Sequence, residues 1–250
     1  IASFWKLPAK IDSITPNKEK NMKKLGIIGA MDVEVATLKE KMTEKTVRTI
    51  AGSDYCEGKL EGLDVVVVQC GIGKVFAAIC AQTMIVKYAP DAVINTGVGG
   101  TLTKKLSVGD VAVSSAMVQH DMDTSALGDP VGLISGINIV EIPADAALAG
   151  KISAIVRGMG INTVTGTIAT GDQFIGSQAV KDRIVNTFGA IACEMEGAAI
   201  GQVCYVNKVP FAVIRAISDD ADGGACEDYP TFAKMAAKNS AKAVIALANG

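Results

Sequence analysis

The feature of the sequence that most constrains its fold is a repeated alternation of short apolar runs with longer helical patterns, which starts at residue 25. The apolar runs cover residues 25–28, 65–70, 92–96, 110–118, 163–170, 190–193 and 210–217. The helical patterns cover residues 33–42, 75–88, 144–158, 179–187, 196–206 and 229–248. Parallel strands that are buried on both faces read as continuous Val/Ile runs. The order therefore predicts an α/β domain with a mostly parallel central sheet flanked by helices, in which strand follows helix throughout.

Two segments do not share this pattern. Residues 1–21 contain two prolines and four lysines, have no helical or strand period, and lack the long apolar stretch of a signal peptide. We interpret them as an N-terminal extension, a leader or an added segment, ahead of one domain over residues 22–250. Residues 119–150 are rich in Asp, Gly and Pro and predict an excursion over the surface.

Charge and hydropathy exclude several classes of partner. With 24 basic and 26 acidic residues the net charge is −2, so the chain lacks the basic footprint of a protein that binds nucleic acid or an anionic membrane. No uninterrupted apolar run reaches the roughly 18 to 20 residues of a membrane span. We expect the partner to be a small uncharged molecule or another copy of the chain.

Cysteine and histidine usage narrows the chemistry. The six cysteines form no CxxC pair and mostly lie in apolar runs, as free core cysteines do in a reducing compartment, so we expect a cytoplasmic protein. The only histidine is His120, so a multi-histidine zinc site is excluded. A Ser-His-Asp triad could use only this residue. We interpret His120 as a loop histidine after a strand, and we predict no metal site.

Acidic residues cluster where two apolar runs end. Glu194 and Glu196 follow the run 190–193, and Asp219 follows the run 210–217. Both groups are expected at the carboxyl-end rim of the sheet, where open α/β sheets bind ligands. An extended backbone would place Glu194 and Glu196 on one side, whereas a helix would turn them apart and use their charge at its N-terminus. The sequence leaves both alternatives open.

Glycine-bearing turns follow several of the strands, but they do not form a cofactor motif. The turn at residues 71–74 has Phe76 where the dinucleotide fingerprint needs a glycine, and the turn at 97–100 has Leu102 at its sixth position. Such glycines also serve ordinary strand-to-helix turns. An NAD enzyme is therefore not expected.

A series of motifs resembles one known family along the whole of residues 22–250. The motifs lie at residues 26–34, 71–74, 95–97, 108–110, 170–175, 194–196 and 215–219. In this order they resemble the 5′-methylthioadenosine/S-adenosylhomocysteine nucleosidases of the nucleoside phosphorylase superfamily. The resemblance implies a single α/β domain with a mixed sheet, a homodimer, no metal or organic cofactor, and hydrolysis of an N-glycosidic bond that releases adenine.

The resemblance assigns the chemistry to three residues. Asp219 matches the acid that protonates N7 of the purine, because adenine leaves poorly unless its ring nitrogen is protonated. Ser218 would help to orient that carboxyl group. Glu34 matches the residue that positions and deprotonates the attacking water. For Asp219 to hold a proton near neutral pH its pKa must be raised, most plausibly by desolvation.

The remaining matches concern substrate binding. Glu196 would bind the ribose hydroxyls, Met195 would pack on ribose and base, and Glu194 would act only behind them. Phe174 would stack on adenine, and the backbone of Ile175 would read its exchangeable edge. The 5′-alkylthio pocket would be formed by Met31, Ile72 and Tyr229, with Thr124 and Leu127 contributed by the partner subunit.

Departures from the family pattern leave the substrate preference open. Val98 stands where many members have serine, Tyr229 where phenylalanine is frequent, and Thr124 and Leu127 replace larger or more apolar residues. The candidates are methylthioadenosine, S-adenosylhomocysteine, 5′-deoxyadenosine and aminodeoxyfutalosine.

Two other functions remain as alternatives. A phosphorolytic relative would need donors for phosphate near the ribose, where the anionic Glu34 would repel it and Val98 offers no hydrogen bond. A non-catalytic nucleoside-binding protein of the same fold would not need Glu34, Glu196 and Asp219 together.

Overall fold

The computed structural model describes residues 22–250, which form one α/β domain around a mixed ten-stranded sheet. The expected extension at residues 1–21 lies outside the described residues. The chain runs through β1 (Lys24–Gly29), α1 (Asp32–Lys41), β2 (Thr43–Ile50), β3 (Ser53–Leu60), β4 (Leu63–Gln69), α2 (Lys74–Tyr88), β5 (Ala92–Thr101) and β6 (Val111–Gln119). It continues through η1 (Ser125–Leu127), β7 (Ile142–Pro143), α3 (Ala146–Gly158), β8 (Thr163–Thr170), α4 (Gln178–Phe188), β9 (Ala192–Glu194), α5 (Gly197–Asn207), β10 (Phe211–Asp219) and α6 (Ala225–Ala248).

The sheet closes on itself at one end and extends as an open wing at the other. Its order is β10-β6-β8-β9-β5-β1-β4-β3-β2, and β10 also pairs with β5. Strands β5, β9, β8, β6 and β10 therefore form a closed ring, while β1, β4, β3 and β2 extend from β5. The pairs β1–β4, β1–β5, β5–β10, β6–β8 and β8–β9 are parallel, and the others in this path are antiparallel.

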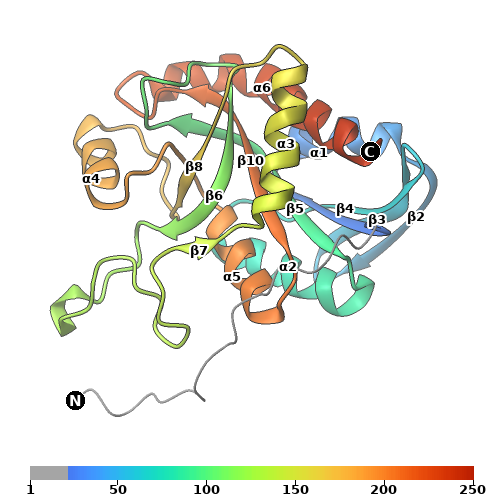
Figure 1. The fold of residues 1–250 in the computed structure, drawn as a ribbon, viewed down its shortest axis with the longest axis horizontal. Helices are drawn as coiled ribbons and strands as arrows, with labels where there is room; N and C mark the ends of the chain where they lie inside the picture. Colours follow the sequence, from blue (N-terminus) through green and yellow to red (C-terminus); the bar gives the residue numbers. More distant parts are fainter. Residues whose placement is uncertain (1–21) are drawn as a thin grey trace.

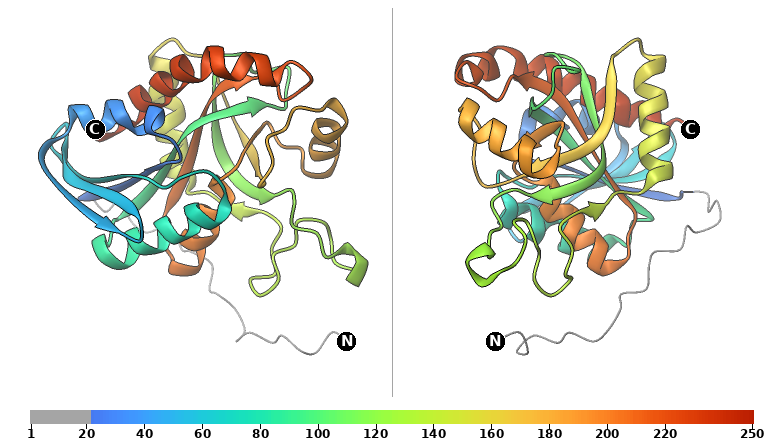
Figure 2. Two further views of the ribbon diagram at one scale, coloured as in Figure 1. Left: turned by 180° about the vertical axis from the view of Figure 1, so that it is seen from behind. Right: turned by 60° about the vertical axis from the view of Figure 1, so that its left-hand side comes forward.

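Helices cover the sheet in separate layers (Figure 1). One core cluster joins the sheet to α1, α3 and α6, and a second joins it to α2 and α5. A smaller cluster packs α4 against β8 and the 190–193 region. The segment between β6 and β7, which contains η1, extends away from this body, as the two further views also show (Figure 2). The predicted surface excursion is confirmed for this segment.

Most of the predicted elements are confirmed, and one prediction is wrong. The helices and strands from residue 146 onward lie within a few residues of the expected positions, although α6 begins at Ala225 and not at residue 229. The expectation that strand follows helix throughout fails between residues 43 and 69, where β2, β3 and β4 follow one another as antiparallel neighbours, and again where β6 follows β5 directly. The short strand β7 was also not predicted.

The two hairpins were missed because their signals differ from those of a buried parallel strand. Every residue of β2 except the last is exposed, so its sequence TEKTVRTI shows no apolar run. The turns are Ala51-Gly52 and Glu61-Gly62, with positive φ at all four residues. Paired positive φ values are typical of the type I′ turns of two-residue hairpins, but Asn-Gly or Asp-Gly is the usual sequence for them.

The central strands supply the stability of the fold. Ile94 in β5 is fully buried between β1 and β10, and replacing it with Ala should lower the free energy of unfolding by roughly 2–5 kcal/mol. Urea unfolding followed by circular dichroism measures this. Val47→Ala is the control, because Val47 is exposed on the edge strand β2 and its loss should cost within about 0.5 kcal/mol. Equal losses for the two variants would contradict the placement of the core.

Candidate active site

A pocket of about 300 Å³ opens at the carboxyl ends of β1, β4, β5, β8, β9 and β10. This is the rim where the sequence predicts ligand binding. Its lining includes every residue that the resemblance assigned to catalysis or substrate binding within one chain: Met31, Glu34, Ile72, Phe174, Ile175, Met195, Glu196, Ser218, Asp219 and Tyr229. Six segments separated along the chain are thus brought together at one place.

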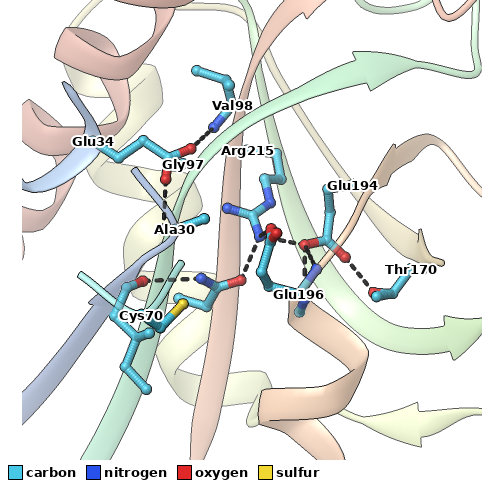
Figure 3. Close-up of polar contacts among 12 residues, drawn as sticks. Ala30, Glu34, Cys70, Gly97, Val98, Thr170, Glu194, Glu196 and Arg215 are labelled. Atoms are coloured by element: carbon cyan, nitrogen blue, oxygen red, sulfur yellow. Dashed lines mark hydrogen bonds and ion pairs between the residues drawn. The ribbon is translucent and has the colours of Figure 1, made fainter. Parts of the chain in front are cut away.

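Glu34 is held rigidly at one side of the pocket. It lies in the first turn of α1 and is buried. Its Oε2 accepts hydrogen bonds from the amides of Ala30 at 2.7 Å and Met31 at 2.9 Å, and its Oε1 accepts one from Val98 at 3.0 Å (Figure 3). These donors come from the β1–α1 turn and from β5. Both carboxylate oxygens therefore have fixed positions facing the sheet.

Glu194 and Glu196 converge on a buried arginine, Arg215 of β10 (Figure 3). The open alternatives for the two glutamates are resolved by where the helix begins. Glu194 ends β9, α5 starts at Gly197, and Glu196 is the N-cap residue between them. Arg215 Nη2 contacts Glu194 Oε2 closely and lies 3.4 Å from Glu196 Oε2. The two glutamates therefore belong neither to one regular strand nor to one regular helix.

Both carboxylate oxygens of Glu194 accept hydrogen bonds from groups within the protein. Its Oε2 accepts the amides of Glu196 at 2.9 Å and Gly197 at 2.7 Å, and its Oε1 accepts the Thr170 hydroxyl. It therefore satisfies the N-terminus of α5 and anchors Arg215, although it also borders the pocket. Its position behind Glu196 agrees with the supporting role that the sequence indicated.

Glu196 retains capacity for a ligand. Its Oε1 accepts the amide of Gly73 at 2.9 Å, and its contact with Arg215 is long. Burial and the charge of Glu194 together raise the pKa of Glu196 to about 7, although Arg215 and the Gly73 amide oppose them. A buried carboxylate with a free lone pair at the pocket surface is suited to accept hydrogen bonds from a polyol.

Asp219 lies at the opposite end of the pocket, where a β-bulge changes the direction of its side chain. The register of β10 against β5 shifts between Ile217 and Asp219, so that Asp219 faces Gly100. Ser218 Oγ donates to Asp219 Oδ2 at 2.8 Å and the Ala221 amide to Oδ1 at 3.0 Å. Burial raises the pKa of Asp219, and these two hydrogen bonds only partly oppose it. The raised pKa agrees with the expectation for a carboxylic acid that must hold its proton.

The remaining wall of the pocket is apolar and aromatic. Phe174 and Tyr229 meet edge to face with ring centroids 5.6 Å apart, and the Tyr229 hydroxyl lies 3.1 Å from Met31 Sδ. Phe174 is 47% exposed and Ile72 is 54% exposed, so this wall is covered incompletely within one chain. A planar ring could stack on Phe174 while its polar edge meets Asp219 and the backbone of Ile175.

Sequence reasoning missed the role of Arg215 and the reason for Gly97. Nε and Nη1 of Arg215 are buried and have no hydrogen-bond partner among residues 22–250. A Cβ on Gly97 would lie 2.2 Å from Arg215 Nη1 and 2.4 Å from Glu34 Oε1. Only glycine therefore lets the guanidinium and this carboxylate approach the same spot. The motif around residue 97 was visible in the sequence, but the spatial neighbour that requires it was not.

Several other predicted residues lie away from the pocket of a single chain. Thr124 and Leu127 are in the extended segment at η1, and Leu127 is 81% exposed. His120 follows β6 as predicted but is buried against Gly171, and burial lowers its pKa. Within residues 22–250 no group of three or more His, Cys, Asp or Glu side chains is arranged to hold a metal ion.

Comparisons with known proteins agree on one group. A profile described as the phosphorylase superfamily matches residues 24–249. The 5′-methylthioadenosine/S-adenosylhomocysteine nucleosidase of Shewanella sediminis is 43% identical over 226 residues, which cover 90% of this chain and 98% of the relative. The structure of the enzyme of that name from Neisseria meningitidis, in complex with methylthio-immucillin-A, superposes with a TM-score of 0.88 at 36% identity, covering 91% of this chain and 99% of that one.

One further structural neighbour carries a different name. The native futalosine hydrolase of Helicobacter pylori superposes with a TM-score of 0.85 at 33% identity, covering 89% of this chain and 96% of that one. The fold is therefore shared by hydrolases whose names state different substrates.

Arg215 should be essential for stability in a pH-dependent way. Arg215→Met leaves Glu194 and Glu196 buried without their cation, which should cost about 3–5 kcal/mol at neutral pH. The pKa of Glu196, already raised, should rise further, so the folded state keeps a proton that the unfolded state releases. Stability is then lost as pH rises from about 5 to about 8.

Thermal unfolding across this pH range measures the effect. The control is Arg48→Met, which removes an exposed arginine on β2 and should change little at any pH. A loss for Arg215→Met that is as large at pH 5 as at pH 8 would contradict the electrostatic cause.

Proposed function

The chain belongs to the phosphorylase superfamily, as one of its 5′-methylthioadenosine/S-adenosylhomocysteine nucleosidases, and we propose which residues of its pocket carry out the reaction. The protein is an N-ribosyl hydrolase that cleaves the N-glycosidic bond of methylthioadenosine and of S-adenosylhomocysteine. Water adds to the ribose carbon, and adenine leaves together with a proton. The products are adenine and 5-methylthioribose or S-ribosylhomocysteine.

The mechanism rests on one observation. The pocket contains several carboxyl groups, which lie apart from one another and have different surroundings. Asp219 is the acid: its desolvated carboxyl holds the proton that N7 of the purine receives as the bond breaks. Ser218 orients the carboxyl through its 2.8 Å hydrogen bond. Phe174 stacks on the base, and the backbone of Ile175 reads its exchangeable edge, which leaves Asp219 beside the ring nitrogen.

Glu34 is the base that takes a proton from the attacking water. We place that water against the Glu34 carboxylate where it lines the pocket. Glu34 accepts a hydrogen bond from the water, so the oxygen lone pair is free to attack the ribose carbon. The three amides that bind Glu34 keep its carboxylate from turning away.

Glu196 binds the ribose hydroxyls, and Met195 packs against the ribose and the base. The oxocarbenium-like transition state carries positive charge, which nearby carboxylates stabilise. The 5′-alkylthio group then lies against Met31, Ile72 and Tyr229, the exposed apolar end of the pocket.

The phosphorolytic alternative is disfavoured by the same geometry. Phosphate would require several donors beside the ribose carbon. Val98 has no side-chain donor there, its amide is used by Glu34, and Arg215 Nη2 is bound by Glu194 and by Asn95 at 2.5 Å. A non-catalytic nucleoside-binding protein would need neither the carboxylate of Glu34 at the water position nor the desolvated carboxyl group of Asp219.

The active unit that we propose is a homodimer. On α2, Val75, Phe76, Ile79 and Val86 are large apolar side chains that are at least 46% exposed. Val206 on the neighbouring α5 extends this surface, since α2 and α5 pack together. A second copy would cover it, and Thr124 and Leu127 of that copy would close the open end of the pocket beside Ile72.

A cytoplasmic location is supported by the thiols. All six cysteines lie among the described residues and are free, five of them buried. Burial raises the pKa of Cys70 and Cys193, which keeps these thiols protonated and unreactive. Among the helices of residues 22–250, none is long and apolar enough to cross a bilayer.

The acid assignment is tested by adenine release from methylthioadenosine, with and without phosphate. Wild type should turn over without phosphate, and Asp219→Asn should lose at least about 10²–10⁴ in kcat because the amide cannot supply the N7 proton. Asp220→Asn, an exposed neighbour, should stay near wild type. A phosphate requirement would make the protein a phosphorylase, and an active Asp219→Asn would remove Asp219 as the acid.

The dimer is tested by light scattering and by activity on the same samples. Phe76→Glu with Ile79→Glu should give the mass of one chain and should raise KM, because the second copy no longer closes the pocket. Met235→Glu is the matched control, since Met235 is also an exposed apolar side chain but lies on α6. A wild-type chain that is monomeric at assay concentration and fully active would refute the proposal.

A further inference from the structure

The N-terminus of α2 is capped by carboxylates from distant parts of the chain. Its N-cap residue is Gly73, with φ of 97°, and the first turn contains no acidic residue of its own. The Gly73 amide donates to Glu196 Oε1 at 2.9 Å, and the Lys74 amide donates to Asp172 Oδ1 at 2.8 Å. Helix N-termini need such acceptors. One of the two acceptors is the ribose ligand proposed above.

Lys74, Asp121 and Asp172 form a closed ring of hydrogen bonds, which we call the Lys74 clip. Lys74 Nζ donates to Asp121 Oδ1 at 2.7 Å, the Asp172 amide donates to Asp121 Oδ2 at 2.9 Å, and Asp172 Oδ1 accepts from the Lys74 amide. Lys74 Nζ also lies 3.2 Å from Gln119 Oε1. The Lys74 and Asp121 side chains are only 21% and 18% exposed, so solvent screens this ion pair weakly.

The clip joins two segments that lead into the pocket to a third segment, after β6, that does not line it. Lys74 follows the turn that contains Ile72 and Gly73, Asp121 follows β6, and Asp172 stands two residues before Phe174. None of the three clip residues belongs to the described lining of the pocket. They therefore touch the binding residues through the backbone and not the substrate.

The charge state of the clip agrees with its geometry. Burial alone would raise the pKa of Asp121, but the hydrogen bonds from Lys74 and from the Asp172 amide outweigh it, and the pKa is lowered. The ion pair thus persists through neutral pH. By contrast, Asp219 and Glu34 are held by their own neighbours on β10 and on the β1–α1 turn, independently of the clip.

From this arrangement we propose that Lys74, Asp121 and Asp172 are positioning residues that hold the purine-stacking loop and the ribose-binding carboxylate in register with each other. The inference rests on the proposed function for the identity of the ligand. Its mechanical consequence is that loss of the clip weakens binding of the nucleoside at both ends, because Phe174 and the Gly73–Glu196 contact move independently. The chemical step, carried by Asp219 and Glu34, is affected less.

Kinetics of clip variants test the proposal. Lys74→Met and Asp121→Asn should each raise KM for methylthioadenosine about ten-fold, the size expected for one lost charge-assisted hydrogen bond, with kcat within about two-fold. The double variant should be no worse than about the larger single, because either change already opens the ring. Lys74→Arg, which keeps a donor cation within reach of Asp121, should recover most of the loss.

The matched control is another lysine–aspartate pair, Lys59 and Asp64 on the β3–β4 hairpin, whose 3.0 Å ion pair is exposed and remote from the pocket. Lys59→Met should leave KM unchanged. Adenine binding, measured by calorimetry, provides a readout that does not depend on hydrolysis: the clip variants should weaken it, even if wild type were to fail as a nucleosidase. A fall in melting temperature with unchanged KM and unchanged adenine affinity would overturn the proposal.

Discussion

The interaction on which the rest of the structure depends is the buried contact of Arg215 with Glu194. A guanidinium at 0% exposure is tolerated only when its charge is matched. Glu194 supplies the charge, and Asn95 binds the same nitrogen while its amide donates to the Ile28 carbonyl at 2.9 Å. This chain of contacts links β10, β9, β5 and β1 to one another. These contacts hold the rim of the sheet in place without a ligand.

The position of Glu196 follows from this anchor. Because Glu194 Oε2 accepts the amides of Glu196 and Gly197, the backbone must turn from strand to helix at Glu196. The turn leaves the Glu196 side chain at the pocket surface, between Arg215 and the N-terminus of α2. Two glutamates separated by one residue thus have different surroundings: Glu194 is bound within the protein, and Glu196 is the one that we propose as the ligand of the ribose. Both are buried, so what distinguishes them is the number of hydrogen bonds that each accepts within the protein.

The sequence predicts the architecture of the site better than it predicts the contacts that make it work. Buried strands such as β4 and β10 are visible as Val/Ile runs, and the ordered motifs locate Glu34, Phe174 and Asp219 at strand ends. The exposed β2 gives no such signal, since a strand that buries almost nothing has no apolar pattern. Arg215 and Gly97 are 118 residues apart, so no local rule reveals that one requires the other.

The charge balance around Gly97 explains why this site favours water over an anionic nucleophile. Glu34, Glu194 and Glu196 surround a single arginine, so the wall beside the ribose is formally negative. Phosphate would have to enter against that field. Neutral water meets no such barrier, and the positive charge that develops on the ribose is stabilised by the same carboxylates. Hydrolysis in preference to phosphorolysis thus follows from the excess of carboxylates over arginine at this rim of the sheet.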